Sequence, residues 1–130
     1  MPRVLVVDDD VGIRQSIALS LEAAGITADT AANGRIAIKQ LCRSCTENEP
    51  YDLLTLDIIM PEVDGWQVLK AVKNNPLWSS LKVIVVSAEV QSAEDLTHII
   101  EWDGVFVEKR IDFSRDVVTI VTRILDGQPQ

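Results

Sequence analysis

Short hydrophobic runs alternate with segments of helical periodicity along the whole chain. Four runs rich in valine, leucine and isoleucine predict strands at residues 3–7, 52–56, 82–86 and from 105 onward, and a loosely alternating segment with small residues predicts a fifth at 26–31. Apolar residues recur at helical spacing in the segments between and after them, which predicts five helices: at 12–24, after 34, after 65, at 92–100 and at 114–125. Strands that alternate with helices are typical of βαβ units, so the pattern predicts an α/β protein with a mostly parallel sheet.

Local signals refine several of these elements. The first strand is an almost unbroken apolar run, as expected for a central strand covered on both faces, whereas 26–31 alternates loosely and suits a sheet edge. The first helix stops at Gly25 and carries one apolar stripe, formed by Ile13, Ile17, Leu21 and Ala24. In the last helix Ser114 is the predicted N-cap, and Phe113 and Val118 can form a hydrophobic staple.

The composition is that of an ordinary globular protein: 130 residues, of which 47% are hydrophobic and 25% charged. We expect one domain at residues 1–125, followed by a tail or the start of a linker at 126–130. No apolar stretch approaches the ~20 residues that span a bilayer, and the N-terminus lacks the features of a secretory signal, so we expect a cytoplasmic protein. The net charge of −8, with lysines and arginines spread along the sequence, argues against direct nucleic-acid binding.

Cys42 and Cys45 match the C-x-x-C spacing of redox and zinc sites. The pair falls at the end of a helical segment and not after a strand. Zinc needs about four ligands. Besides the two cysteines, the chain offers His98 as one weaker candidate ligand. We therefore interpret the two cysteines as ordinary cytosolic thiols.

Polar side chains stand where four of the predicted strands end. Asp8 and Asp9 follow the first strand, Asp57 the third, Ser87 the fourth and Lys109 the fifth. Because the carboxyl ends of parallel strands meet at one edge of a sheet, we expect these side chains to form one pocket. Carboxylates gathered there repel one another, so the arrangement implies a bound metal or shifted pKa values. Mg²⁺ is usually held by one or two carboxylates together with water and phosphate oxygens, and Asp9 and Asp57 can be its direct ligands.

With these residues in place, the chain resembles the receiver domain of two-component response regulators over essentially all of its length. The resemblance rests on motifs in the right order: the Val-Val-Asp-Asp opening, Asp57 with Met60-Pro61 and Asp64-Gly65, Ser87-Ala88 after a valine-rich strand, and Lys109. It implies a flavodoxin-like, doubly wound fold with five parallel strands in the order 2-1-3-4-5 and five helices. It also implies a phosphoprotein that acts in a two-component phosphorelay.

The resemblance gives each acidic residue a role. Asp57 would accept the phosphoryl group, since a carboxylate can act as a nucleophile towards phosphorus. Asp9 and Asp57 would bind Mg²⁺ or Mn²⁺, Asp8 would hold a water of the metal, and Ile59 would add its backbone carbonyl. The domain would promote its own phosphorylation and dephosphorylation, and we do not expect a dedicated enzyme.

The same resemblance predicts a switch. Lys109 and Ser87 would neutralise the phosphoryl oxygens. In similar receivers the strand-four hydroxyl moves inward and an aromatic residue of strand five follows, which makes Ser87 and Phe106 the expected switch pair; Phe106 can equally be a core aromatic. The surface that would change is formed by the fourth helix, the fifth strand and the fifth helix. The expected partners are a sensor histidine kinase or phosphotransfer protein and a downstream output domain or protein, and a homodimer is left open.

Two departures from the family pattern keep an alternative open. Arg110 stands where the family usually has proline after the lysine, often with a cis peptide bond, so we expect a different loop path there. Trp102 precedes the fifth strand, either as a local plug or exposed to a partner. These features suggest a receiver-like interaction module that works without phosphorylation. Asp10 is expected to be a helix cap and not a metal ligand.

Overall fold

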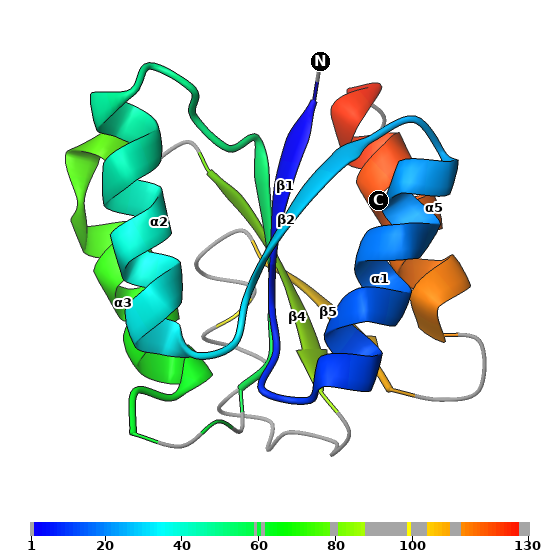
Figure 1. Ribbon diagram of the computed structural model, residues 1–130, viewed down its shortest axis with the longest axis horizontal. Coiled ribbons are helices and arrows are strands. Elements are labelled where there is room, and N and C mark those ends of the chain that lie inside the picture. Colours follow the sequence, from blue (N-terminus) through cyan, green and yellow to red (C-terminus); the bar gives the residue numbers. More distant parts are fainter. Residues whose placement is uncertain are drawn as a thin grey trace.

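The computed structural model describes residues 2–58, 60, 62–78, 81–87, 99, 104–109 and 113–127. Its strands form one parallel sheet in the order β2-β1-β3-β4-β5 (Figure 1). They are β1 (Arg3–Val7), β2 (Thr27–Ala31), β3 (Leu53–Leu56), β4 (Lys82–Ser87) and β5 (Val105–Glu108). The predicted doubly wound α/β fold and strand order are confirmed.

Helices cover both faces of this sheet. The α-helices in the described part of the chain are α1 (Val11–Ala23), α2 (Gly34–Thr46), α3 (Gly65–Asn74) and α5 (Phe113–Leu125), with a short 3-10 turn, η1, at Pro76–Trp78. In Figure 1, α2 and α3 lie on one side of the sheet and α1 and α5 on the other. The helix predicted at 92–100 falls almost wholly outside the described residues.

The sheet separates two apolar clusters, because alternate side chains of each strand point to opposite faces. The cluster under α2 and α3 includes Leu5, Leu41, Leu54, Leu56 and Leu69, all 1% exposed or less. The cluster under α1 and α5 includes Val4, Val6, Ile17, Leu53 and Val117, equally buried. The central strands are therefore apolar on both faces, as the unbroken hydrophobic runs indicate.

Short polar side chains start the helices. Asp10 caps α1 by accepting from the Ile13 amide at 3.1 Å, which confirms its predicted role as a cap. Asn33 caps α2 in the same way. Asp64 and Gln67 form a reciprocal capping box at the start of α3, where the sequence motif Asp64-Gly65 lies. These caps fix where the chain turns at the carboxyl edge of the sheet.

Three details of the predicted helices were wrong. Helix α1 begins one residue earlier than predicted because Asp10 is its cap, and Ala24 is exposed because it follows the last helical residue. Helix α5 begins at Phe113, which places Ser114 inside the first turn and not at the N-cap. The Ser114 hydroxyl instead lies 2.9 Å from that of Ser16 and joins α5 to α1. The predicted staple depends on the Phe113 side chain, which lies outside the described part of the structure.

Cys42 and Cys45 lie on α2, and both thiols are free. Cys45 Sγ accepts a hydrogen bond from Trp78 Nε1 at 3.3 Å, so one of the pair packs against η1. The second strand lies at the sheet edge, as predicted, and begins at Thr27. Among the described helices, none has the length and apolar character needed to cross a membrane.

Candidate functional site

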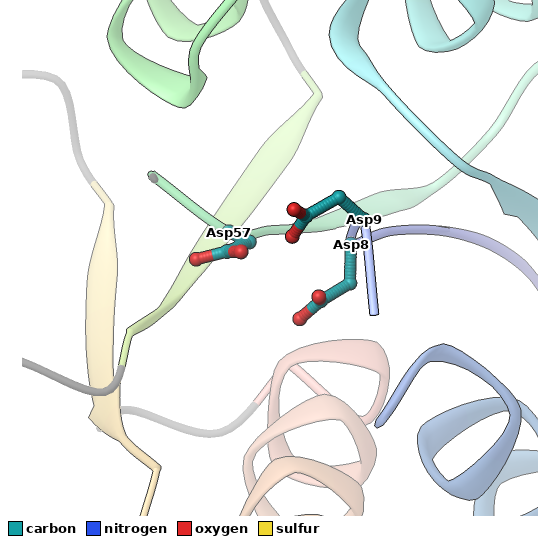
Figure 2. A group of neighbouring side chains, drawn as sticks. All are labelled: Asp8, Asp9 and Asp57. Atoms are coloured by element: carbon teal, nitrogen blue, oxygen red, sulfur yellow. The ribbon is translucent and has the colours of Figure 1, made fainter. Parts of the chain in front are cut away.

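Three carboxylates meet at the carboxyl edge of the sheet. Asp8 and Asp9 follow β1 and Asp57 follows β3; one carboxylate oxygen from each lies within 4.8 Å of the others (Figure 2). The register explains the proximity, because Val7 pairs with Leu56 and the Asp57 amide donates to the Val7 carbonyl at 3.0 Å. Residues from distant parts of the sequence are thereby brought to one point, as the strand ends predict.

The three side chains differ in their exposure. Asp8 is 1% exposed and Asp57 5% exposed, whereas Asp9 faces solvent. Buried carboxylates lose their hydration and need positive charge or hydrogen-bond donors nearby. Asp8 Oδ1 receives a hydrogen bond from the Asp10 amide at 2.9 Å. This contact fixes the orientation of the Asp8 carboxylate.

Lys109 brings the ammonium to this edge. Its Nζ lies 2.8 Å from Asp8 Oδ2 and 3.5 Å from Asp57 Oδ2, and its side chain is 11% exposed. The backbone amide of Lys109 donates to the Ser87 carbonyl at 2.8 Å, which aligns the end of β5 with β4. Among the residues that the structure describes, Lys109 is thus the cation paired with Asp8 and Asp57.

The donor set fits a hard divalent cation. Mg²⁺ takes oxygen ligands and commonly one or two carboxylates, and carboxylate oxygens are what Asp8, Asp9 and Asp57 present. Asp8 Oδ2 is buried and accepts no hydrogen bond from the described residues. The Lys109 ammonium lies 2.8 Å from this oxygen, which makes the contact an ion pair, but its angles are not those of a hydrogen bond. That oxygen therefore retains capacity for a further electrophilic partner.

Ser87 and Phe106 occupy neighbouring strands on the same face. Ser87 ends β4 and is fully buried, and Phe106 of β5 is half-buried against the cluster under α2 and α3. Phe106 pairs with Val85, two residues before Ser87, so the two side chains point to the same side of the sheet. This placement is compatible with both predicted roles of Phe106, as a switch partner of Ser87 and as a core aromatic.

Gly65 holds the loop after Asp57 close to the strand end. Its amide donates to the Ile58 carbonyl at 2.8 Å. A Cβ at this position would lie 2.3 Å from the Asp57 carbonyl oxygen and 2.5 Å from Ile58 Cα. The sequence motif marked Gly65, but this close backbone approach was not predicted.

Several predicted residues cannot be placed. Ile59, Trp102 and Arg110 lie outside the described residues, so neither the carbonyl ligand nor the altered loop is defined. The close pairing of Lys109 with Asp8 was missed by the sequence reasoning, which directed this ammonium towards a phosphoryl group on Asp57. No sequence signal distinguishes the two carboxylates as its nearer partner.

Fold and site together define a signalling domain of the receiver class. The chain belongs to the response regulator receiver domain family, whose model matches residues 4–121. This confirms the family, the flavodoxin-like fold and the function class predicted from the motifs.

Among curated proteins, the chain is 29% identical over 124 residues to the chemotaxis protein CheV1 of Helicobacter pylori, covering 95% of this chain and 38% of that protein. It is 41% identical over 87 residues to the transcriptional regulatory protein PrrA of Mycobacterium tuberculosis, covering 67% of this chain and 34% of that protein. The chain thus spans little more than a third of the length of these relatives.

Solved structures agree. The chemotaxis protein CheY4 of Vibrio cholerae is 26% identical with a TM-score of 0.79, covering 95% of this chain and 98% of that one. The response regulator TrrA of Thermotoga maritima, in complex with Mg²⁺ and BeF, is 30% identical with a TM-score of 0.75, covering 94% and 98% of the two chains.

Proposed function

We propose that this domain accepts a phosphoryl group on Asp57 from the phosphohistidine of a sensor kinase or phosphotransfer protein, in a reaction that depends on Mg²⁺ or Mn²⁺. The observation that carries the proposal is the arrangement of Asp57. This carboxylate is 5% exposed, has an oxygen within 4.8 Å of oxygens of Asp8 and Asp9, and lies 3.5 Å from the Lys109 ammonium.

The chemistry is a transfer between two nucleophiles. An Asp57 carboxylate oxygen attacks phosphorus and forms a P–O bond, while the P–N bond to the donor imidazole breaks and its electron pair returns to the nitrogen. Little covalent work is required of the protein, so positioning and charge neutralisation dominate catalysis. The buried surroundings of Asp57 strengthen both the positioning and the charge neutralisation, because few waters screen the charges.

Asp8, Asp9 and Asp57 would hold the metal, with the Ile59 carbonyl as a further ligand proposed from the family resemblance. Mg²⁺ bound there would reduce the repulsion among the carboxylates and neutralise charge on the phosphoryl oxygens. Lys109 Nζ, now between Asp8 and Asp57, would contact a phosphoryl oxygen on Asp57. Lysine suits this task because its ammonium is a compact charge on a flexible stem.

The signal would be transmitted along β4 and β5. The Ser87 hydroxyl would bind the phosphoryl group, and Phe106 would follow it on the same face of the sheet. This change would alter the surface that includes β5 and α5, where an output domain or protein would bind. The domain would act on itself alone and would not be a dedicated enzyme; whether it forms a homodimer would depend on the same surface.

The test uses acetyl phosphate, and separately beryllofluoride, each with Mg²⁺. Asp57→Asn should abolish the mass increase of one phosphoryl group and the beryllofluoride-induced spectral change. Asp10→Asn is the matched control, because Asp10 lies beside the cluster, and asparagine also caps helices. Equal labelling of the wild type and Asp57→Asn would refute the proposal. Full Mg²⁺ binding without labelling would refute phosphoacceptance alone, and absence of Mg²⁺ binding would favour the phosphorylation-independent interaction module.

A further inference from the structure

Helices α2 and α3 have a charge opposite to that of the whole protein. Together they hold five of the twelve lysines and arginines and none of the twenty aspartates and glutamates. The two helices pack side by side on one face of the sheet (Figure 1). Cations that are spread along the sequence are thus gathered in space, which corrects the expectation of an evenly distributed charge.

Four of these five cations are exposed to solvent; Lys73 is half-buried and donates to the Leu81 carbonyl. Arg35, Lys39 and Arg43 recur every fourth residue of α2 and therefore lie along one stripe of the helix. All three are exposed, and so is Lys70 on α3. Arg35 is paired with Glu62 at 3.3 Å. Lys39, Arg43 and Lys70 form no ion pair with any residue that the structure describes, so they remain available to an external acidic group.

A hollow lined mostly by apolar residues, with Ser44 among them, lies at the C-terminal end of the same face. It is bounded by Cys45 of α2, by Pro50 and Tyr51 before β3, and by Leu77 and Trp78 of η1. Its cavity volume is about 60 Å³, which leaves room for the few heavy atoms of one leucine side chain. Leu77 at its rim is 73% exposed, the most exposed large hydrophobic residue of the described chain.

The basic stripe and the hollow are contiguous, because Arg43 directly precedes Ser44 and Cys45, which line the hollow. Burial, the hydrogen bond to Asp29 and the charge of Asp29 raise the pKa of Tyr51, and Arg43 is close enough for its charge to oppose that rise. Arg43 on the stripe and Tyr51 in the hollow are therefore electrostatic neighbours. An extended segment lying along α2 could contact both without a bend.

We propose that the α2–α3 face is a docking surface for an acidic segment of a partner protein that carries one large apolar side chain. Its carboxylates would lie against Lys39, Arg43 and Lys70, and its apolar side chain would fill the hollow beside Leu77. Charge complementarity with the exposed Lys39, Arg43 and Lys70 favours an acidic partner, and the adjacent hollow favours a protein segment, because proteins carry large apolar side chains. The hollow accepts one side chain, which a uniform polyanion lacks, so it adds specificity for a protein segment.

The α2–α3 face differs from the surface of β5 and α5 that the proposed switch would alter, although the switch residues Ser87 and Phe106 lie on the α2–α3 side of the sheet. α2 and α3 lie across the sheet from α1 and α5 (Figure 1). Docking here would leave the surface of β5 and α5 free for an output partner. Binding should accordingly be the same in the wild type and in Asp57→Asn, which separates the failure of this proposal from the failure of the proposed function.

The test uses a fluorescein-labelled synthetic peptide of about ten residues, with a central leucine flanked by aspartates and glutamates. In extended form it is longer than the roughly 20 Å of α2. Binding is measured by fluorescence anisotropy near physiological ionic strength with the whole chain. Lys39→Glu/Arg43→Glu should weaken binding about tenfold or more, since two attractive pairs become repulsive. Arg115→Glu/Arg123→Glu on α5, with the same change in net charge, should weaken it less than about threefold.

The hollow is tested separately with Leu77→Ser. This substitution should weaken binding of the leucine peptide and should not affect binding of a peptide with serine in place of the leucine. The control is Leu19→Ser on α1, at a residue that is 66% exposed, and its effect on binding should differ from that of Leu77→Ser. Thermal unfolding verifies that each variant is folded. The proposal is overturned by lack of saturable binding, by equal effects of the two charge reversals, or by equal effects of the two leucine substitutions. Tighter binding of phosphatidylserine vesicles or a short DNA oligonucleotide, lost in Lys39→Glu/Arg43→Glu, would likewise overturn it.

Discussion

Thr55 occupies the middle of the sheet with a hydroxyl that has no partner among the described residues. It is 1% exposed and lies on β3 between Val6 of β1 and Ile84 of β4. Both neighbours belong to the apolar cluster under α1 and α5. The hydroxyl therefore loses its hydration on folding without a protein hydrogen bond in return.

Thr55→Val should stabilise the protein by about 1–2 kcal/mol. A buried unsatisfied polar group costs about 1–3 kcal/mol, and valine removes that cost. The substitution replaces the hydroxyl with a methyl group of similar size, which adds apolar burial. Both residues are branched at Cβ, so the rotamer and strand preferences change little. For a domain of 130 residues this corresponds to a rise in Tm of roughly 3–8 °C.

The assay is urea unfolding followed by tryptophan fluorescence and circular dichroism, so that two probes test whether the transition is two-state. The matched control is Thr30→Val on edge strand β2, where the side chain is exposed. That change should stay within about 0.5 kcal/mol of the wild type. If Thr55→Val is neutral or destabilising, the hydroxyl is satisfied in solution and the reasoning from its apolar surroundings fails.

Two further predictions concern other parts of the molecule. Tyr51 is the only tyrosine, so its absorbance titration should give a pKa of about 12, raised from 10.0 by burial and by the hydrogen bond to Asp29. Since the unfolded state ionises first, the free energy of unfolding should fall as the pH rises from 10.0 towards 12, by about 1 kcal/mol after solvent screening. Gly65→Ala should destabilise the protein by about 2–3 kcal/mol in urea unfolding, because its Cβ would meet the Asp57 carbonyl oxygen at 2.3 Å.

Each of these has a matched control. Asp29→Asn should lower the Tyr51 pKa towards 10.0, whereas Asp52→Asn, whose carboxylate accepts from the Arg3 amide, should shift it less. A Tyr51 titration near 10.0 in the wild type would contradict the assigned environment. Gly12→Ala on the exposed side of α1, where the Cβ would meet only the Asp10 carboxylate at 3.3 Å, should change the stability by less than about 1 kcal/mol. If Gly65→Ala is equally harmless, the close backbone approach is not required.

The sequence was sufficient for the sheet because its physical signal is strong. Central strands that are apolar on both faces appear as unbroken hydrophobic runs, and the residue after each run must lie at the same edge. This reasoning predicts that Asp8, Asp9, Asp57, Ser87 and Lys109 lie at one edge of the sheet. The first helix was shifted by only one residue, since its cap was already recognised as a polar turn residue.

The sequence was insufficient where side chains from different elements meet. Ser114 is a reasonable N-cap by residue type, but the start of α5 is set by the backbone before it, and its hydroxyl lies beside Ser16. The hydrogen bond from Trp78 to Cys45 joins positions whose separation gives no periodic signal. The basic face was missed for the same reason, because its cations lie on two helices divided by β3.

The position of Lys109 has a consequence for the order in which the protein is made. All three carboxylates leave the ribosome before this lysine, and β5 can join the sheet only along β4. A nascent chain that has already folded β1 and β3 together holds its acidic residues side by side without their ammonium. Free divalent cations should therefore stabilise a nascent chain that lacks β5 more than they stabilise the whole domain.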